Sequence, residues 1–349
     1  MNQMQQFIKQ LKPRRHRKKP NSNQPVTCWS EQDRFHDDIV DAFVLILRTQ
    51  GCSWMFQSGC TMCGYFNDSM LSPVTADQLI NQYQQAMKQY NDESIVKIFT
   101  SGSFLDENEI PKKVQEYILS DLNDKTKKIA VESRPEYITQ DSMKLLNKTV
   151  TEAEFDIGIG LETSQDFIRK IAINKGFSFQ DYLNSVNLTH ENDFNVKTYI
   201  LIKPPFLTEK EAIQDVKQTI DQVLQHTTTN DILSFNPASV QKNTLVEYLW
   251  RRNQYRPPWL WSIIEILTYA AKQTQQTRLQ CDITGGGKKR GAHNCYQCDQ
   301  NVLTAIKDFS LSQNPEIFHN VTCSCQQLWY DQLHLEPISF GSLSDVMRP

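Results

Sequence analysis

Short apolar runs alternate along the chain with longer segments in which apolar positions recur every three or four residues. The short runs predict β-strands and the longer segments predict helices, and their alternation is typical of βα units that build a parallel sheet. We expect strands at six positions, namely 41–48, 94–100, 128–132, 155–161, 195–203 and 231–235. We expect helices between most of them, for example over 75–90, 107–122 and 208–224, with Thr75 and Thr208 as N-caps.

Six strand–helix repeats are too few for a closed eightfold barrel, but they suffice for an open, partial (β/α)6 barrel. The predicted fold class is therefore α/β. Polar or glycine-containing segments follow the predicted strands, as at Gly51-Cys52, at Thr100-Ser101-Gly102-Ser103 and at 132–136. Because ligands of such sheets bind at the carboxyl ends of the strands, we expect the functional site on this rim.

Composition limits the class of protein. The chain has 349 residues, of which 39% are hydrophobic and 22% charged, so most of it should fold. The longest apolar run, 42–47, falls far short of the roughly 20 residues of a membrane span, and no apolar signal segment follows the N-terminus. We therefore expect a soluble, cytoplasmic protein that makes no membrane contact.

Basic residues are concentrated at the N-terminus. Residues 1–20 carry basic side chains and no acid, although the net charge of the whole chain is -3. We interpret residues 1–25 as a flexible basic arm that contacts a polyanion, residues 26–280 as the barrel core, and residues 281–349 as a cysteine-rich C-terminal extension.

Three cysteines stand close together after the first predicted strand. Cys52, Cys60 and Cys63 are spaced Cys-x7-Cys-x2-Cys in a loop bordered by glycines. A 4Fe-4S cluster normally takes four thiolates, so three would leave one iron open for another ligand. The alternatives are a zinc site that lacks its fourth ligand, or thiols that bind no metal.

A second group of cysteines lies in the C-terminal extension. Its members, Cys295, Cys298, Cys323 and Cys325, form a Cys-x2-Cys pair followed by a Cys-x-Cys pair, which suits a closed structural zinc site. A second iron–sulfur cluster is the rival interpretation. Cys281 or His293 could replace one of the four ligands, whereas Cys28 stands alone and is expected to be a buried thiol.

The cysteine loop resembles that of the radical SAM superfamily, whose three cysteines usually follow the pattern Cys-x3-Cys-x2-Cys with an aromatic residue before the last. Here the first gap is seven residues and Met62 takes the aromatic position. Within that superfamily the chain resembles the archaeosine-forming family, which is related to the catalytic subunit of Elongator. The segments that carry this resemblance are Gly51-Cys52-Ser53-Trp54, Gly59-Cys60-Thr61-Met62-Cys63-Gly64-Tyr65, 100–104, 132–136, 160–163, 236–237, 241–242, 255–261 and 293–295.

The resemblance implies a partial (β/α)6 radical SAM barrel and a lyase-type reaction on tRNA. The substrate would be a D-loop that carries a lysine adduct of 7-cyano-7-deazaguanine. The enzyme would cut the carbon–nitrogen bond beyond the lysine side-chain nitrogen, which leaves archaeosine. The implied partners are tRNA, the lysine-transferring archaeosine synthase protein and a one-electron donor, and the implied cofactors are a 4Fe-4S cluster, S-adenosylmethionine (SAM) and structural Zn2+.

The resemblance also suggests residues that bind SAM. Ser101, Gly102 and Ser103 would hold its methionine end, Glu132 and Glu162 would accept hydrogen bonds from the ribose hydroxyls, and Lys175 would pair with the methionine carboxylate. Candidates for phosphate or lysine-carboxylate contacts are Arg134, Lys203, Arg251, Arg252 and Arg256, and the basic run from Lys12 to Lys19 is expected to contact the RNA backbone.

Other functions remain open at this stage. Elongator-like acyl transfer normally needs an added domain, for which the roughly 70 residues after Gln280 leave little room. Methylthiolation would call for a second set of three cysteines near the N-terminus, where Cys28 is the sole cysteine before Cys52. A non-enzymatic, zinc-stabilised RNA-binding protein is the third alternative.

Overall fold

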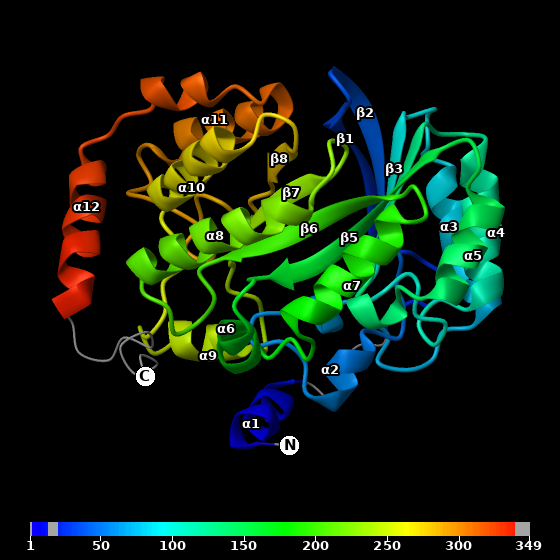
Figure 1. Ribbon diagram of the computed structural model, residues 1–349. Helices are drawn as coiled ribbons and strands as arrows, with labels where there is room; N and C mark the ends of the chain where they lie inside the picture. The colour runs from blue at the N-terminus through cyan, green and yellow to red at the C-terminus, as the bar shows by residue number, and fades with distance from the viewer. Residues whose placement is uncertain (1, 13–19, 339–349) are drawn as a thin grey trace. The chain divides into compact units, whose positions relative to one another are not determined.

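The computed structural model describes residues 2–12 and 20–338, and its strands follow one another in sequence order through one sheet (Figure 1). β1 pairs with β2 in the antiparallel sense, whereas the pairings from β2 to β5 and of β7 with β8 are parallel. The strands are β1 (Thr27–Phe35), β2 (Asp38–Ile46), β3 (Ile95–Phe99), β4 (Lys128–Glu132), β5 (Glu154–Glu162), β6 (Asn195–Ile202), β7 (Ile232–Pro237) and β8 (Arg278–Cys281). This arrangement is the predicted α/β half-barrel.

Helices follow most of the strands, which gives the repeating βα pattern. In chain order the helices are α1 (Gln3–Leu11), α2 (Ser53–Gln57), α3 (Ala76–Met87), α4 (Lys112–Asn123), α5 (Gln140–Thr149), α6 (Asp166–Ile168), α7 (Phe179–His190), α8 (Glu209–Val223), α9 (Leu245–Trp250), α10 (Leu260–Gln273), α11 (Asp299–Ser312) and α12 (Cys325–Leu335). Within the described residues, no helix is long and apolar enough to cross a membrane.

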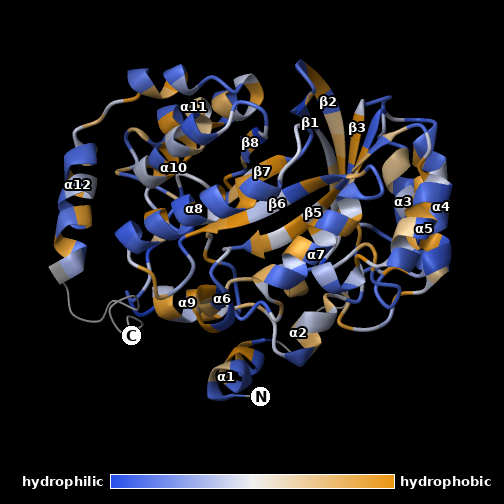
Figure 2. Ribbon diagram, in the orientation of Figure 1, coloured by the Kyte–Doolittle hydropathy of each residue, from blue (hydrophilic) through white to orange (hydrophobic). Residues whose placement is uncertain are grey.

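The chain divides into two compact units. The first contains residues up to 59 together with 63–160 and 180–197, and the second contains 60–62, 161–179 and the residues from 198 onward. In the first unit, the apolar run 42–45 of β2 is completely buried, as expected for a strand covered on both faces. Figure 2, coloured by hydropathy, shows many hydrophobic residues along the strands and many hydrophilic residues on the helices.

The core of the second unit is formed by β7, α8 and α10. Leu233 and Phe235 of β7, Val216 of α8, and Ile263 and Ile266 of α10 are all fully buried. On α8 the apolar residues recur every three or four positions, so one face of the helix enters the core and the other stays polar.

The predicted elements are confirmed with small shifts at their ends. The six expected strands are β2 to β7, and the three expected helices are α3, α4 and α8, although α4 begins at Lys112 rather than at 107. Thr75 and Thr208 are the N-caps of α3 and α8, and each accepts a hydrogen bond from the third helical residue in a capping box.

Two strands were missed, so the prediction of six is corrected to eight. β1 contains five consecutive polar residues, Ser30, Glu31, Gln32, Asp33 and Arg34. Most residues of this edge strand are exposed or half-buried, so the apolar pattern that would predict a strand is absent. β8 has only four residues and follows a polar, glutamine-rich segment, which leaves too short an apolar pattern to recognise.

The predicted flexible arm is partly helical. α1 begins after the N-cap Asn2, whose side chain accepts a hydrogen bond from the Gln5 N–H at 2.8 Å, and its Ile8 is buried. The sequence interpretation overlooked Met4, Phe7, Ile8 and Leu11, which share one helical face. Residues 13–19, with most of the basic cluster, lie outside the described residues.

Candidate active site

The cysteine loop starts directly after β2 in the first unit. Gly51 has a φ of 112°, and a Cβ added there would lie 3.0 Å from the Ser69 hydroxyl, so this sharp turn requires glycine. Cys52 follows as the N-cap of α2 and is half-buried. The turn therefore fixes the place at which the Cys52 side chain leaves the backbone.

The far end of this loop is held by α1. The Lys12 ammonium donates a hydrogen bond to the Ser58 carbonyl at 2.7 Å and lies 5.4 Å from the centre of the Phe66 ring. A Cβ on Gly59, whose φ is 78°, would come within 1.7 Å of the Lys12 nitrogen. The sequence predicted that Lys12 contacts the RNA backbone. In the structure its ammonium contacts the cysteine loop.

The segment 60–62 is anchored within the second unit. Thr61 donates its hydroxyl to the Ala172 carbonyl at 2.7 Å and its N–H to the Ile173 carbonyl at 2.9 Å. Cys60 and Met62 pack against a buried apolar cluster that contains Ala172 and Ile173. Cys60, like Cys52 and Cys63, is half-buried, and the role of the three as cluster ligands stays a prediction.

The loop after β3 meets the cysteine loop at Gly102. A Cβ on Gly102 would lie 2.7 Å from the Cα of Cys52 and 2.2 Å from Oε2 of Glu109. Any side chain at this position would therefore push the two loops apart. Gly102 thus lies directly against the backbone of Cys52, whereas its contact with SAM stays a prediction.

Glu109 joins the two loops by hydrogen bonds, although the sequence interpretation did not single it out. Its carboxylate accepts the Thr49 hydroxyl at 2.5 Å and the Ser103 N–H at 2.7 Å. Burial raises the pKa of Glu109 to about 7, against the hydrogen bonds from Thr49 and Ser103 that lower it. In sequence Glu109 belongs to the acidic run 106–109, which is typical of a solvated turn, so no local signal marks it.

The loop after β4 continues this chain of contacts. The Arg134 N–H donates to the Ser103 hydroxyl at 3.0 Å, and the Phe104 N–H donates to the Glu132 carbonyl at 2.8 Å. The Arg134 guanidinium pairs with Glu136 at 2.6 Å and lies 5.4 Å from the centre of the Trp54 ring on α2. Three consecutive loops at the carboxyl end of the sheet are thus linked in the first unit.

Glu162 and Lys175 meet in the second unit. Their ion pair measures 2.6 Å, and both side chains are mostly buried. Glu162 has a φ of 70°, and Lys175 follows the π-helical segment Arg169–Ile173. Both backbone features are uncommon and are found preferentially at functional sites. The two residues were expected to bind different groups of SAM, and the structure shows that they also contact each other.

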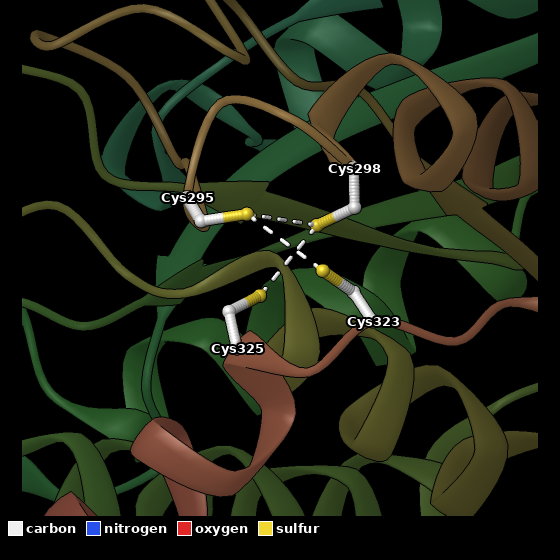
Figure 3. Close-up of side chains that lie close together, drawn as sticks. All are labelled: Cys295, Cys298, Cys323 and Cys325. Atoms are coloured by element: carbon white, nitrogen blue, oxygen red, sulfur yellow. Dashed lines mark hydrogen bonds between the residues drawn. The ribbon is translucent and has the colours of Figure 1, made fainter.

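The four C-terminal cysteines converge on one point (Figure 3). All four sulfurs lie within 4.8 Å of one another, and the separations of Cys295 from Cys298, Cys295 from Cys323, and Cys298 from Cys325 are 3.8, 3.8 and 3.7 Å. The two pairs lie at the starts of α11 and α12. A metal ion held by this group would therefore join the two helices to each other, as structural metal sites do.

Neither alternate ligand belongs to this group. Cys281 is buried in β8, where its N–H donates to the Ser310 hydroxyl at 3.0 Å. His293 contacts the Gly291 carbonyl at 2.7 Å through Nδ1, and its ring stacks on that of Tyr296 at 5.1 Å. Cys28, in β1, is only half-buried rather than fully buried, and burial raises the pKa of its thiol.

A cavity of about 930 Å3 lies within the second unit. Lys203, Arg251 and Arg256, three of the basic candidates, line it together with Lys289. Arg252 does not line the cavity and lies instead over the Tyr248 ring, 3.6 Å from its centre. The sequence could not distinguish these basic residues from one another. In the structure, Arg251 lines the cavity and Arg252 does not.

The fold and the cysteine loop define the class of this protein. Residues 46–219 match the radical SAM superfamily, so the chain is a radical SAM enzyme. It is 38% identical over 325 residues to archaeosine synthase subunit beta of Methanosarcina acetivorans, which covers 92% of this chain and 93% of that protein. The subunit of the same name from Thermococcus kodakarensis is 34% identical over 311 residues, 87% of this chain and 95% of that protein. The chain belongs to the family of archaeosine synthase subunit beta.

Among solved structures, an archaeal Elp3 from Methanocaldococcus infernus that lacks its N-terminus is similar in fold. The similarity covers 85% of this chain and 63% of that chain, with 13% identity and a TM-score of 0.48.

Proposed function

We propose that this protein is the radical SAM subunit that completes archaeosine in tRNA, in the cytoplasm. The substrate is the lysine adduct of 7-cyano-7-deazaguanine in the D-loop, and the enzyme cuts the carbon–nitrogen bond beyond the lysine side-chain nitrogen. Removal of one hydrogen atom from the carbon next to that nitrogen, and of one further electron to a one-electron acceptor, would give an imine. Its hydrolysis by water would leave the formamidine on the tRNA and release the lysine carbon skeleton as an aldehyde. The observation that carries the proposal is the contact of Gly102 with Cys52, in a chain of this family, because it joins the cysteine loop to the segment proposed for SAM.

The donor set on the cysteine loop fits an iron–sulfur cluster with one open iron. Cys52, Cys60 and Cys63 would hold three irons, and the amino and carboxylate groups of SAM would take the fourth. When bound, the cluster and SAM supply a carbon radical strong enough to remove a hydrogen atom next to the lysine nitrogen, which no side-chain acid or base can do. The electron comes from a one-electron donor.

The residues of this chain would then position SAM and its surroundings. Ser101, Gly102 and Ser103 would hold the methionine end, and Glu109 keeps that segment against Cys52 through its hydrogen bonds to Thr49 and Ser103. Glu132 and Glu162 would accept the ribose hydroxyls. Lys175, whose ammonium pairs with Glu162 at 2.6 Å, would reach toward the methionine carboxylate.

We propose zinc for the C-terminal site. Four sulfurs at the corners of a tetrahedron, each about 2.3 Å from the ion, are separated by about 3.8 Å. The observed separations of 3.7–3.8 Å support a single ion. The Trp261 indole N–H and the Asn294 amide donate to Cys325 and Cys298 at 3.3 and 3.4 Å, which suits sulfurs that carry negative charge.

The relatives carry the name subunit beta, which supports a partner subunit for this chain as well. The partner would be the protein that transfers lysine to the base. Because the two reactions share one modified nucleotide, we expect both proteins to bind the same tRNA.

The test is an anaerobic incubation of the reconstituted protein with SAM, dithionite and tRNA that bears the lysine adduct. Mass spectrometry should detect archaeosine and 5'-deoxyadenosine, whereas Cys60→Ala should give neither and lose iron. Cys28→Ala is the matched control and should behave like wild type. Adduct that stays intact while 5'-deoxyadenosine accumulates would contradict the proposed substrate, and normal iron content in Cys60→Ala would contradict the ligand assignment.

A further inference from the structure

The cavity of the second unit has the size and composition of a binding site for a nucleic acid segment. Its volume of about 930 Å3 is at the upper end of the range of ligand pockets, roughly 300–1,000 Å3. Its lining includes four cationic side chains and five aromatic or imidazole rings, and no carboxylate is among the lining residues. The residues that matter for the argument are Lys203, Arg251, Arg256, Lys289, Phe206 and Tyr296.

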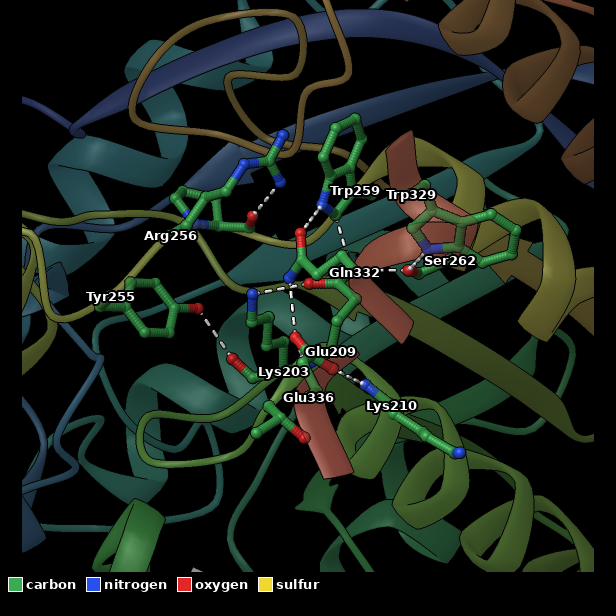
Figure 4. A network of polar contacts seen from close by, with 12 residues as sticks. Lys203, Glu209, Lys210, Tyr255, Arg256, Trp259, Ser262, Trp329, Gln332 and Glu336 are labelled. Atoms are coloured by element: carbon green, nitrogen blue, oxygen red, sulfur yellow. Dashed lines mark hydrogen bonds and ion pairs between the residues drawn. The ribbon is translucent and has the colours of Figure 1, made fainter. Parts of the chain in front are cut away.

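Two of the cations are held firmly in place (Figure 4). Lys203 pairs with the buried Glu209 at 2.6 Å, and the Tyr255 hydroxyl donates to the Lys203 carbonyl at 2.8 Å. The Arg256 guanidinium donates to the carbonyls of Pro257 and His293 and lies 4.1 Å from the centre of the Trp259 ring. Such fixed cations lose little entropy when they bind an anion.

The C-terminal end of the described chain supports this network. Glu336 accepts the main-chain N–H groups of Glu209 and Lys210 at 3.0 and 2.8 Å, and Gln332 on α12 accepts the Trp259 indole N–H at 2.8 Å. Residues near Lys203 and Arg256 are thus hydrogen-bonded to α12, which begins at Cys325, and to Glu336, which follows it.

The other two cations face solvent. Arg251 and Lys289 are exposed; the first makes a 3.0 Å ion pair with Glu247, and the second lies 5.7 Å from the centre of the Trp250 ring. Because no carboxylate is among the lining residues, these two exposed cations can contact phosphate groups of a ligand in the cavity.

Two of the aromatic residues that line the cavity are exposed to solvent. Tyr296 is 56% exposed and Phe206 is 41% exposed, although large rings are normally covered. The Tyr296 ring lies nearly parallel to that of His293, with 9° between their planes. An RNA base that leaves its helical stack can lie on such a ring, since stacking on aromatic side chains is the common way to bind unpaired bases.

The backbone around the cavity is strained at the same residues. Lys203, Phe206, Asn253 and Tyr296 all have left-handed backbone conformations, with φ values of 64°, 74°, 58° and 69°. Bulky residues rarely adopt this conformation, and such strain is concentrated at ligand sites. The four residues lie on three separate segments, so ordinary turn formation at one place does not explain them.

The cavity also lies next to one end of the cysteine loop. Cys60 and Met62 pack against the apolar cluster that contains Leu207 and Tyr255, and Trp250 packs against this cluster too. Leu207, Tyr255 and Trp250 line the cavity. A ligand in the cavity would therefore be close to Cys60.

We infer that this cavity binds an unstacked segment of the substrate RNA, with phosphates on Arg251, Arg256, Lys203 and Lys289 and with one base against Tyr296 and another against Phe206. The inference rests on the proposed function, which makes tRNA the substrate. An enzyme that acts on a base must take it out of the stack, and this cavity supplies both the rings and the cations for doing so.

The test measures binding of an unmodified tRNA transcript to the full-length holoprotein at several salt concentrations. Tyr296→Ala and Phe206→Ala should each weaken binding about tenfold, the usual loss for one stacked base. Arg251→Ala should weaken binding and flatten its dependence on salt. Tyr330→Ala, an exposed tyrosine on α12, and Lys307→Ala, an exposed lysine on α11 that does not line the cavity, are the matched controls and should bind as wild type does.

Crosslinking identifies the occupant directly. Ultraviolet irradiation of the complex should attach RNA to peptides that contain Phe206 or Tyr296. Cavity variants that bind like the controls, or crosslinks that all fall elsewhere, would overturn the inference. GMP that binds as tightly as tRNA would also overturn it, because the cavity would then be a site for free nucleotides. If tRNA binds in the cavity but its lysine adduct is not converted, the proposed reaction fails and the RNA site stands.

Discussion

Replacing Gly102 with alanine adds one carbon where the loop after β3 meets the cysteine loop. The new Cβ would lie 2.7 Å from the Cα of Cys52, whereas nonbonded carbons are normally at least about 3.5 Å apart, so the loops must separate by about 0.8 Å. Side-chain motion cannot relieve this contact, because the atom that it meets belongs to the backbone. The Glu109 carboxylate, 2.2 Å from the added atom, must move as well.

Such a shift should affect chemistry much more than stability. A displacement of about 1 Å at a reacting centre costs on the order of 100-fold in rate, whereas overpacking costs about 1–3 kcal/mol of folding free energy. We therefore expect Gly102→Ala to form 5'-deoxyadenosine about 100-fold more slowly than wild type, with a melting temperature lower by only about 2–6 °C.

The assay is the anaerobic reduction of SAM by dithionite, followed by quantification of 5'-deoxyadenosine, with iron content and melting temperature measured on the same samples. Gly285→Ala is the matched control. Gly285 has a φ of 69° and nothing within 4 Å of an added Cβ, so alanine costs about 1 kcal/mol of backbone strain without moving Cys52. Gly102→Ala that cleaves SAM at the wild-type rate would refute the proposed link between the two loops.

Four further predictions concern other parts of the chain. Cys298→Ser should lose zinc and lower the melting temperature before it affects SAM cleavage, because the site joins α11 to α12; elemental analysis and thermal unfolding decide this, and an unchanged melting temperature would exclude a structural role. The five Lys and Arg residues within 14–19 lie outside the described residues. Neutralising them should weaken tRNA binding and flatten its salt dependence, while turnover at saturating tRNA persists. Lys12→Met should instead loosen the cysteine loop and reduce the iron content of the purified protein. Burial raises the pKa of Asp215 to about 7, despite the Thr163 hydroxyl at 2.6 Å and the Arg169 charge that lower it. The folded chain therefore keeps a proton on Asp215 that the unfolded chain releases near pH 4, so this group makes the free energy of unfolding fall as pH rises from about 4 to 7. Asp215→Asn should make that fall shallower in thermal scans at several pH values, whereas Glu109 keeps its own contribution. Parallel melting curves for the variant and wild type across that range would contradict the assignment.

Much of the fold follows from local patterns in the sequence. Buried parallel strands such as β2 and β4 read as apolar runs because both of their faces are covered, and Thr75 and Thr208 mark helix starts because their hydroxyls cap the first turn. α1 and β1 were missed for different reasons. α1 has an apolar helical face and a capping box, but the face lies in a segment rich in glutamine and basic residues and was overlooked. β1 is a polar edge strand, so tertiary contacts rather than an apolar pattern decide it.

The sequence also determined which chemistry is available, because thiolates at close spacing can be recognised without a structure. It selected Cys295, Cys298, Cys323 and Cys325, and the folded chain brings these four sulfurs together. It could not choose between them and Cys281 or His293, because pairs about 25 residues apart meet only when α11 and α12 pack. Spacing along the chain does not contain that information.

Tertiary structure alone decided which charges act together. Glu109 appears in sequence as part of an acidic turn, yet its burial between two loops makes it the residue that joins them. Arg251 and Arg252 are adjacent and chemically identical, yet only the first lines the cavity. The local sequence determines the chemistry of a side chain. Its neighbours in space, however, come from distant segments of the chain. Electrostatic and steric interactions depend on the distances to those neighbours, so only the folded structure decides them.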